Sequence, residues 1–204
     1  AASRGLEGAT LFSERPGHFA ELVAQAAADG TELVVAVGGD GTVNEVVNGL
    51  MTLERRPRLG ILPFGTGNDL ARTLALLEDP QEALETIFSG REVPLDVFTV
   101  EQGDGVRYGV NVAAGGFSGT VGEVLTQDFK KQWGPVAYLL GAVKALPDLE
   151  TYETYLTLDD EEVRVSAYNL FVANGRTVAG GKSVSPSSFL DDGLLDVVVV
   201  KAGS

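Results

Sequence analysis

The sequence contains no cysteine and a single histidine, His18. The absence of cysteine excludes disulfide bonds, thiolate metal ligands and thiol nucleophiles, and it is compatible with a reducing cytoplasm. His18 follows Gly17 at an expected helix start, so we interpret it as a polar helix-end residue rather than a catalytic base. No apolar run approaches the roughly 18 residues of a membrane span, and residues 1–4 do not resemble a signal peptide. We therefore expect a soluble, cytoplasmic chain.

Basic residues are also scarce, since 15 Lys and Arg stand against 29 Asp and Glu, for a formal net charge of −14. A nucleic-acid partner needs clustered cations that release counterions, so this balance argues against one. The acidic run at residues 159–162 lies between two alternating segments and is typical of a solvated hairpin turn. The length of 204 residues allows one large or two modest domains without disulfides.

The first half of the sequence alternates strand and helix patterns, and the second half is dominated by strands. Short apolar strands are expected at 33–37 and 59–62, with helices at 17–29, 42–53, 68–76 and 80–89. Later strands are expected at 92–100, 106–113, 152–158, 162–173 and 194–200, with one helix at 134–146. The prediction is an α/β protein. A doubly wound, mostly parallel domain (1–97) precedes a mainly antiparallel β-rich domain (98–204), and the active-site cleft lies between them.

Two glycine-rich turns follow the two apolar strands. Residues 38–42 read Gly-Gly-Asp-Gly-Thr, and residues 65–69 read Gly-Thr-Gly-Asn-Asp. Because parallel strands end at one edge of a sheet, both turns are expected at the ligand-binding edge. Glycine N–H groups and the helix start at Thr42 can hold phosphate oxygens, while Asp40 suits a magnesium ion or its water shell. Neither turn is a dinucleotide fingerprint, and the chain has no Walker loop.

These two turns resemble the diacylglycerol kinase catalytic domain, and more narrowly the bacterial soluble lipid kinases. The resemblance is carried by residues 39–45 and 63–72, with further matches at Asp96, 116–117, 134–138, 174–176 and 191–196. It extends from about residue 10 to residue 201. The resemblance implies an enzyme that uses ATP and Mg²⁺ to move the γ-phosphoryl group onto the hydroxyl of diacylglycerol or a related lipid alcohol at the membrane surface.

The resemblance also implies site residues. The nucleotide site maps onto Ser13, Gly39, Asp40, Gly41, Thr42, Val43, Asn44, Glu45, Gly65, Thr66, Gly67, Asn68 and Asp69. Asp40 is expected to serve the catalytic magnesium, with Asp69 and Asp96 completing its polar network. A structural magnesium is expected on the Asp192 carboxylate and the backbone carbonyls of Phe189 and Leu194. The residues alone also allow Ser13 as a plain helix cap and residues 191–193 as an ordinary turn.

Two features of the family are not found in the sequence. The family usually opens with a strand and an Asn-Pro-x-x-Gly segment that touches the nucleotide. It also carries an Asp-Gly-Glu motif, whose glutamate is the proposed proton acceptor for the lipid hydroxyl. We therefore expect the chain to be a piece of a protein of roughly 300 residues, without the usual first strand and truncated at its C-terminus. We also expect these 204 residues alone not to turn over.

Two other functions stay open at this point. One is an NAD kinase-like phosphotransferase, although the position of Asn44 and Glu45 directly after the first turn favours a lipid kinase. The other is a non-catalytic, nucleotide-binding regulatory protein on the same fold. Trp133 beside Phe129, Lys130 and Lys131 suits a transient contact with a membrane, and it is also compatible with ordinary packing beside a solvated basic pair. Exposed sheet edges in the second domain make a homodimer a further expectation.

Overall fold

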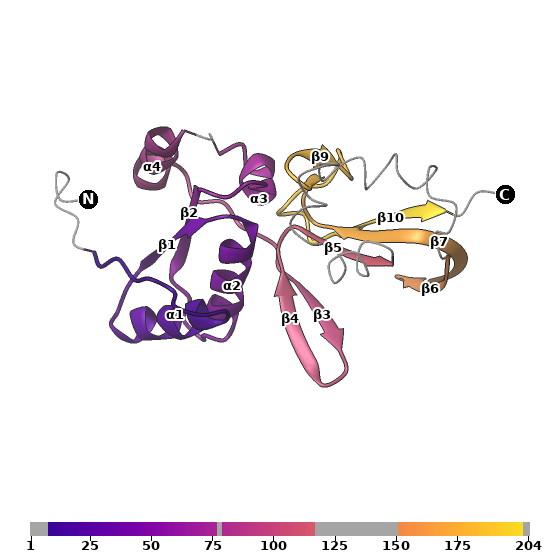
Figure 1. The fold of residues 1–204 in the computed structure, drawn as a ribbon, viewed down its shortest axis with the longest axis horizontal. Coiled ribbons are helices and arrows are strands. Elements are labelled where there is room, and N and C mark those ends of the chain that lie inside the picture. The colour runs from indigo at the N-terminus through magenta and orange to yellow at the C-terminus, as the bar shows by residue number, and fades with distance from the viewer. Residues whose placement is uncertain (1–7, 77–78, 117–150, 202–204) are drawn as a thin grey trace.

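The computed structural model describes residues 8–76, 79–116 and 151–201. Figure 1 shows two lobes in this part of the chain, with a hairpin projecting from the junction between them. The helix expected at 134–146 and the aromatic and basic cluster from Phe129 to Trp133 lie outside the described residues. The predicted order of an α/β part followed by an antiparallel β part is confirmed.

The first lobe, called the α/β lobe, is built on two parallel strands. β1 (Leu33–Gly38) pairs with β2 (Arg58–Pro63), with Ala36 opposite Ile61. The connection between them contains α2 (Asp40–Met51), as expected for a parallel crossover. Short, continuous apolar runs form these strands because both faces of the pair are covered by helices.

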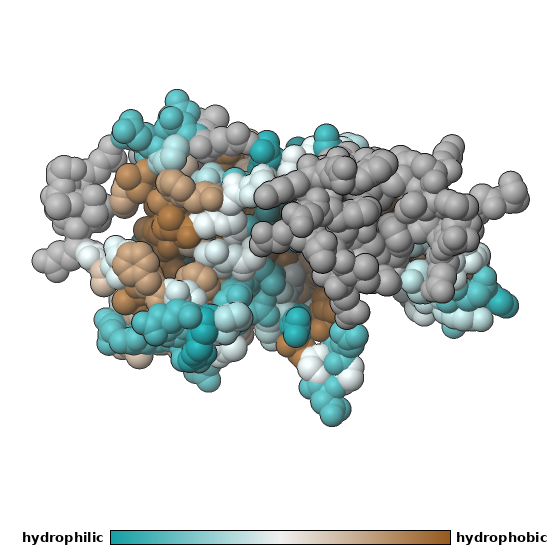
Figure 2. All heavy atoms as spheres, in the orientation of Figure 1, coloured by the Kyte–Doolittle hydropathy of each residue, from teal (hydrophilic) through white to brown (hydrophobic). Residues whose placement is uncertain are grey.

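Helices cover the two faces of this strand pair. On one face, α1 (His18–Ala28) and α2 pack over the strands in one buried cluster, whose members include Val23, Ala36, Val43, Val46, Val47, Leu50, Ile61, Leu70 and Ala71. On the other face lies α4 (Pro80–Ser89), and Gly60 lets it approach, because a Cβ there would lie 3.3 Å from the Ile87 side chain. Figure 2 shows brown, hydrophobic residues at the surface of this lobe. The exposed hydrophobic residues of the lobe include Val37 and Phe64, which are 55% and 60% exposed.

The second lobe, called the β lobe, is an antiparallel sheet organised by one long strand. β7 (Glu161–Ala173) pairs with β6 (Tyr152–Leu158) through its first half, and with β5 (Val112–Gly116) and β10 (Asp196–Lys201) through its second. Ala167, Phe171 and Ala173 alternate along β7 and are buried. The exposed residues Asp159 and Asp160 form the turn between β6 and β7, as the acidic run predicted.

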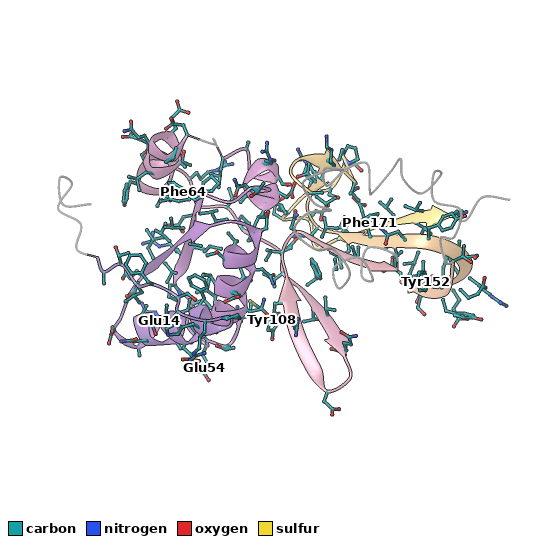
Figure 3. The ribbon with its side chains drawn as sticks, viewed as in Figure 1. Glu14, Glu54, Phe64, Tyr108, Tyr152 and Phe171 are labelled. Atoms are coloured by element: carbon teal, nitrogen blue, oxygen red, sulfur yellow. The ribbon has the colours of Figure 1, made fainter. Side chains whose placement is uncertain are left out.

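Two small hairpins lie at the junction of the lobes (Figure 1). The hairpin of β3 (Phe98–Gln102) and β4 (Gly105–Gly109) is anchored to α2 by the side-chain amide of Asn48, which bonds to both the N–H and the C=O of Tyr108 at 2.9 and 2.8 Å. Figure 3 labels Tyr108, near the base of this hairpin. β8 (Thr177–Val178) pairs with β9 (Lys182–Ser183). Val110 and Leu190 belong to the same buried cluster as the residues of α2, so the lobes share apolar core.

Two predicted elements were too long. The helix expected at 68–76 is the short α3 (Asp69–Thr73), because Ala75 adopts a left-handed φ of 53° and its N–H returns to the carbonyl of Arg72 at 3.0 Å. The strand expected from residue 92 begins only at Phe98, because the preceding residues cross between the lobes. In that crossing the N–H of Asp96 donates to the carbonyl of Leu190 at 2.7 Å rather than to a strand.

The β lobe makes one testable prediction about pH. The hydroxyls of Ser185 and Ser188 donate to Asp196 Oδ2, both at 2.5 Å, and lower the pKa of Asp196 below its ordinary value of 3.8. Because the folded pKa lies below the unfolded one, this stabilisation is present above about pH 4 and is lost as the pH falls through the lowered value. The urea concentration at the unfolding midpoint is therefore expected to fall less between pH 7 and pH 3 in the variant D196N than in the wild type.

The control for this prediction is D160N, in the exposed turn, which should follow the wild-type acid limb. If D196N and D160N show the same pH dependence, the serine-bonded carboxylate does not contribute to acid stability.

Candidate active site

The two glycine-rich turns lie against each other at the carboxyl edge of the strand pair, as the sequence predicted. Gly38 and Pro63 are register partners, and the N–H of Phe64 donates to the carbonyl of Gly38 at 2.9 Å. The contact is closest between Gly39 and Gly65, because a Cβ added at Gly65 would overlap the Cα of Gly39. Both turns therefore require a residue without a side chain at this contact.

Asp40 ties the two turns together. Its Oδ1 accepts the N–H of Asp69 at 2.7 Å and, more weakly, that of Leu70 at 3.4 Å, so it caps the start of α3 from the neighbouring turn. Its Oδ2 lies beside Gly67, where a Cβ would be only 2.6 Å away. Within the described part of the chain Oδ2 makes no hydrogen bond, which leaves one carboxylate oxygen for a cation at the turns.

Asn68 forms its side-chain hydrogen bonds within the second glycine turn. It adopts left-handed backbone angles, with φ at 53°, which asparagine tolerates better than most residues. Its side-chain Oδ1 accepts the N–H of Gly65 at 2.9 Å, and its Nδ2 donates to the Gly65 carbonyl at 2.8 Å. These two bonds close the loop that carries Thr66 and Gly67, so Asn68 shapes the site from within.

The remaining residues predicted to bind the nucleotide lie on α2 or in the loop that precedes α1. Gly41 and Thr42 lie in the first turn of α2, and a Cβ at Gly38 would overlap the Thr42 side chain. Glu45 accepts the N–H of Gly17 at 3.1 Å, which brings the loop around Ser13 next to α2. The Ser13 hydroxyl donates to the carbonyl of Arg15 at 3.0 Å. Val43 is buried in the core, and Asn44 contributes its carbonyl to the Asn48 side chain at 2.8 Å.

Asp96 lies against the predicted metal segment rather than against the glycine turns. Its Oδ2 accepts the N–H of Gly193 at 2.7 Å, and its carbonyl accepts from the Asn174 side chain at 3.0 Å. Among the described residues, Asp96 makes no hydrogen bond to Asp40 or to either turn. Asn174 is 1% exposed and also donates to the Val110 carbonyl at 2.9 Å, so it holds two of the crossings between the lobes together.

The predicted metal segment carries oxygen donors of the kind that a hard cation prefers. Asp192 uses Oδ1 to accept the N–H of Leu194 at 3.0 Å, and the side chains of Phe189 and Leu194 are exposed. Carboxylate and backbone carbonyl oxygens suit Mg²⁺, so the residues fit the ion that the resemblance implies. In the described part of the chain, no group of three or more His, Cys, Asp or Glu side chains forms a metal site, so backbone carbonyls would have to complete this one.

Three hydrogen bonds and one packing contact at the turns were not predicted from the sequence. Asp69 accepts the N–H groups of Gly180 and Gly181 at 3.0 and 2.7 Å. Arg72 donates through Nε to the carbonyl of Gly67 at 3.0 Å and lies against Gly181. In the sequence, residues 180 and 181 are recognisable only as part of a glycine-rich segment, because nothing in a local pattern indicates a partner more than one hundred residues away.

Family models account for nearly the whole chain. Residues 2–100 match the diacylglycerol kinase catalytic domain, and residues 111–204 match the YegS C-terminal NAD kinase beta sandwich-like domain. The chain therefore combines a diacylglycerol kinase catalytic domain with a YegS-type C-terminal domain. Within its described residues, no helix is long and apolar enough to cross a membrane.

Individual relatives agree with this assignment. The chain is 39% identical over 188 residues to a probable lipid kinase YegS-like protein of Chromohalobacter salexigens, covering 91% of this chain and 59% of the relative. It is 33% identical over 198 residues to a diacylglycerol kinase of Bacillus subtilis, covering 97% and 64%. A crystal structure of a diacylglycerol kinase from Bacillus anthracis superposes with a TM-score of 0.75 at 31% identity, over 94% of this chain and 61% of that chain.

The chain thus spans about three fifths of the length of these relatives, while they cover nearly all of it. These coverages do not establish that the chain is a fragment, and that expectation stays a prediction.

The contact between the turns generates a prediction about stability. Gly65→Ala places a methyl group on the Gly39 backbone, which cannot move aside as a side chain would, and we expect a loss of about 1–3 kcal/mol in the free energy of unfolding. The matched control is Gly41→Ala in the facing turn, where an added Cβ meets nothing within 4 Å. Urea unfolding of both variants measures the difference, and equal stabilities would contradict the contact.

Proposed function

We propose that the protein is an ATP-dependent lipid kinase that transfers the γ-phosphoryl group to the hydroxyl of diacylglycerol or a related lipid alcohol. The supporting observation is the pair of glycine turns held together by Asp40 at the carboxyl edge of β1 and β2, in a chain that contains a diacylglycerol kinase catalytic domain. The names of the relatives, a probable lipid kinase and a diacylglycerol kinase, agree with the proposal.

The phosphates of ATP would bind at the start of α2. The first N–H groups of a helix have no carbonyl partner within it, and the helix dipole adds a partial positive charge there. The N–H of Val43 already donates to the Gly39 carbonyl at 3.1 Å, so those of Asp40, Gly41 and Thr42 are the ones that face a ligand. Gly39 and Gly41 allow the phosphates to approach the backbone closely.

Asp40 would hold the catalytic Mg²⁺ through Oδ2. A bound Mg²⁺ neutralises charge on the transferred phosphoryl group. The protein contributes the orientation, because Oδ1 of the same carboxylate is fixed by the N–H of Asp69 at 2.7 Å. The second ion proposed on Asp192, Phe189 and Leu194 would instead brace the turn that contacts Asp96. We further propose a domain boundary near residue 97, a cytoplasmic location, a homodimer and a transient contact with a membrane.

A labelled-phosphate assay on the full-length protein tests the proposed reaction. Radiolabelled ATP and Mg²⁺ are offered with diacylglycerol, phosphatidylglycerol, a sphingoid base and NAD in parallel. Label is expected in a lipid, and it should fall on the order of a hundredfold in D40N and stay unchanged in D160N. Label in NAD alone would favour the NAD kinase-like alternative. ATP binding without any labelled acceptor would favour the regulatory one.

Gly41→Ala provides a sharper test of where the nucleotide lies. An added methyl group there meets no protein atom within 4 Å, so stability should be unchanged or slightly raised. If the phosphates approach this backbone, the KM for ATP should rise about tenfold or more. Gly115→Ala, which is equally open but lies on β5, should leave the KM unchanged. An unaltered KM in Gly41→Ala would place the phosphates elsewhere.

A further inference from the structure

One buried carboxylate joins the α/β lobe to the β lobe. Asp69 lies at the start of α3 and is 5% exposed. Its Oδ2 accepts the N–H of Gly180 at 3.0 Å, and its Oδ1 accepts the N–H of Gly181 at 2.7 Å. Its own N–H donates to Asp40 Oδ1 at 2.7 Å. A single residue therefore contacts the phosphate-binding turn on one side and the β8–β9 turn on the other.

The β8–β9 turn is shaped to receive a negative charge. Ala179, Gly180 and Gly181 have successive positive φ angles of 52°, 81° and 96°. The N–H groups of Gly180 and Gly181 both donate to one carboxylate, and successive N–H groups that converge in this way form a concavity that binds anions. Here the anion is the Asp69 carboxylate, and hydrogen bonds to an ionised group are stronger than neutral ones. Because each carboxylate oxygen accepts one of these N–H groups, the orientation of the Asp69 side chain is fixed by the turn.

Neighbouring contacts make the same junction rigid. The hydroxyl of Thr73, one turn along α3, accepts the N–H of Arg176 at 3.1 Å, and the Thr177 hydroxyl donates to the Asp69 carbonyl at 3.3 Å. The side chain of Arg72 lies against Gly181, 3.4 Å from the position that a Cβ would occupy there. The short helix α3 and the β8–β9 turn therefore behave as one packed unit that spans the two lobes.

We propose that Asp69 is a positioning residue that holds the β8–β9 turn, and with it the β lobe, in register with the nucleotide turns. The inference rests on the proposed lipid kinase function. In that reaction the acceptor hydroxyl, bound between the lobes, must meet a phosphoryl group held at Gly39 to Thr42. Misplacement of reacting groups by about 1 Å can cost on the order of a hundredfold in rate. Loss of the Asp69 contact should thus slow transfer while leaving ATP binding intact.

The test compares D69N with a matched aspartate variant. The amide of D69N would present an N–H₂ group to one of the two backbone N–H donors, so one hydrogen bond is lost and the charge is removed. The control is D79N: Asp79 also accepts two backbone N–H groups, those of Gln81 and Glu82 at 2.8 and 3.1 Å, but it does so at the start of α4. In the full-length protein, D69N is expected to lower kcat for lipid phosphorylation at least tenfold with the KM for ATP within twofold. D79N should leave both constants unchanged.

A second measurement does not depend on activity. Amide hydrogen exchange at residues 177–184 should be faster in D69N than in the wild type and unchanged in D79N. The milder variant Thr73→Val, which removes the acceptor of the Arg176 N–H, should give an intermediate kcat and covers the case in which D69N does not fold.

Three results would overturn the proposal. The first is a wild-type kcat in D69N, and the second is unchanged exchange at the β8–β9 turn. The third is a rise in the KM for ATP with kcat preserved, which would make Asp69 a nucleotide ligand instead. Failure of the proposed function would look different, because the wild type itself would label no lipid while the exchange measurement would still report on the contact.

Discussion

The site depends on one contact, in which the backbones of two turns touch with no side chain between them. Gly39 and Gly65 meet at the carboxyl ends of β1 and β2, and Asp40 closes the contact from the side by accepting the N–H of Asp69. This arrangement sets the start of α2 and the start of α3 relative to each other. The β8–β9 turn is attached to the same contact through Asp69, the first residue of α3.

A series of hydrogen bonds extends from this contact toward the β lobe. Asp40 fixes α3, Asp69 on α3 receives the β8–β9 turn, and Asn174 binds the two crossings at residues 96 and 110. The lobes also share apolar core through Leu190. The apolar contacts make the junction stable, whereas the directional polar links fix its geometry, because hydrogen bonds weaken steeply when donor and acceptor are misaligned.

The local sequence pattern predicted which helices and strands form in the α/β lobe. It did not predict where each one ends or which distant residues it contacts. The runs before residues 38 and 63 predicted β1 and β2, because apolar β-branched residues between helices are typical of a buried parallel strand. The glycines that follow predicted where the turns meet. The early end of α3 was not predictable, since Ala75 adopts a left-handed conformation that its residue type does not favour. Nor was the partner of Asp69, which lies 111 and 112 residues further along the chain.

The length of β7 has a consequence for which changes the chain can accept. Ala167 to Ala173 alternate between the two faces of the sheet, and the same strand leads directly into Asn174 at the junction of the lobes. An insertion of one residue in this stretch would turn its buried face outward and also displace the junction. An insertion at the exposed Asp159–Asp160 turn would change neither. Sequence length is therefore constrained in the second half of β7 and free in the turn that precedes the strand.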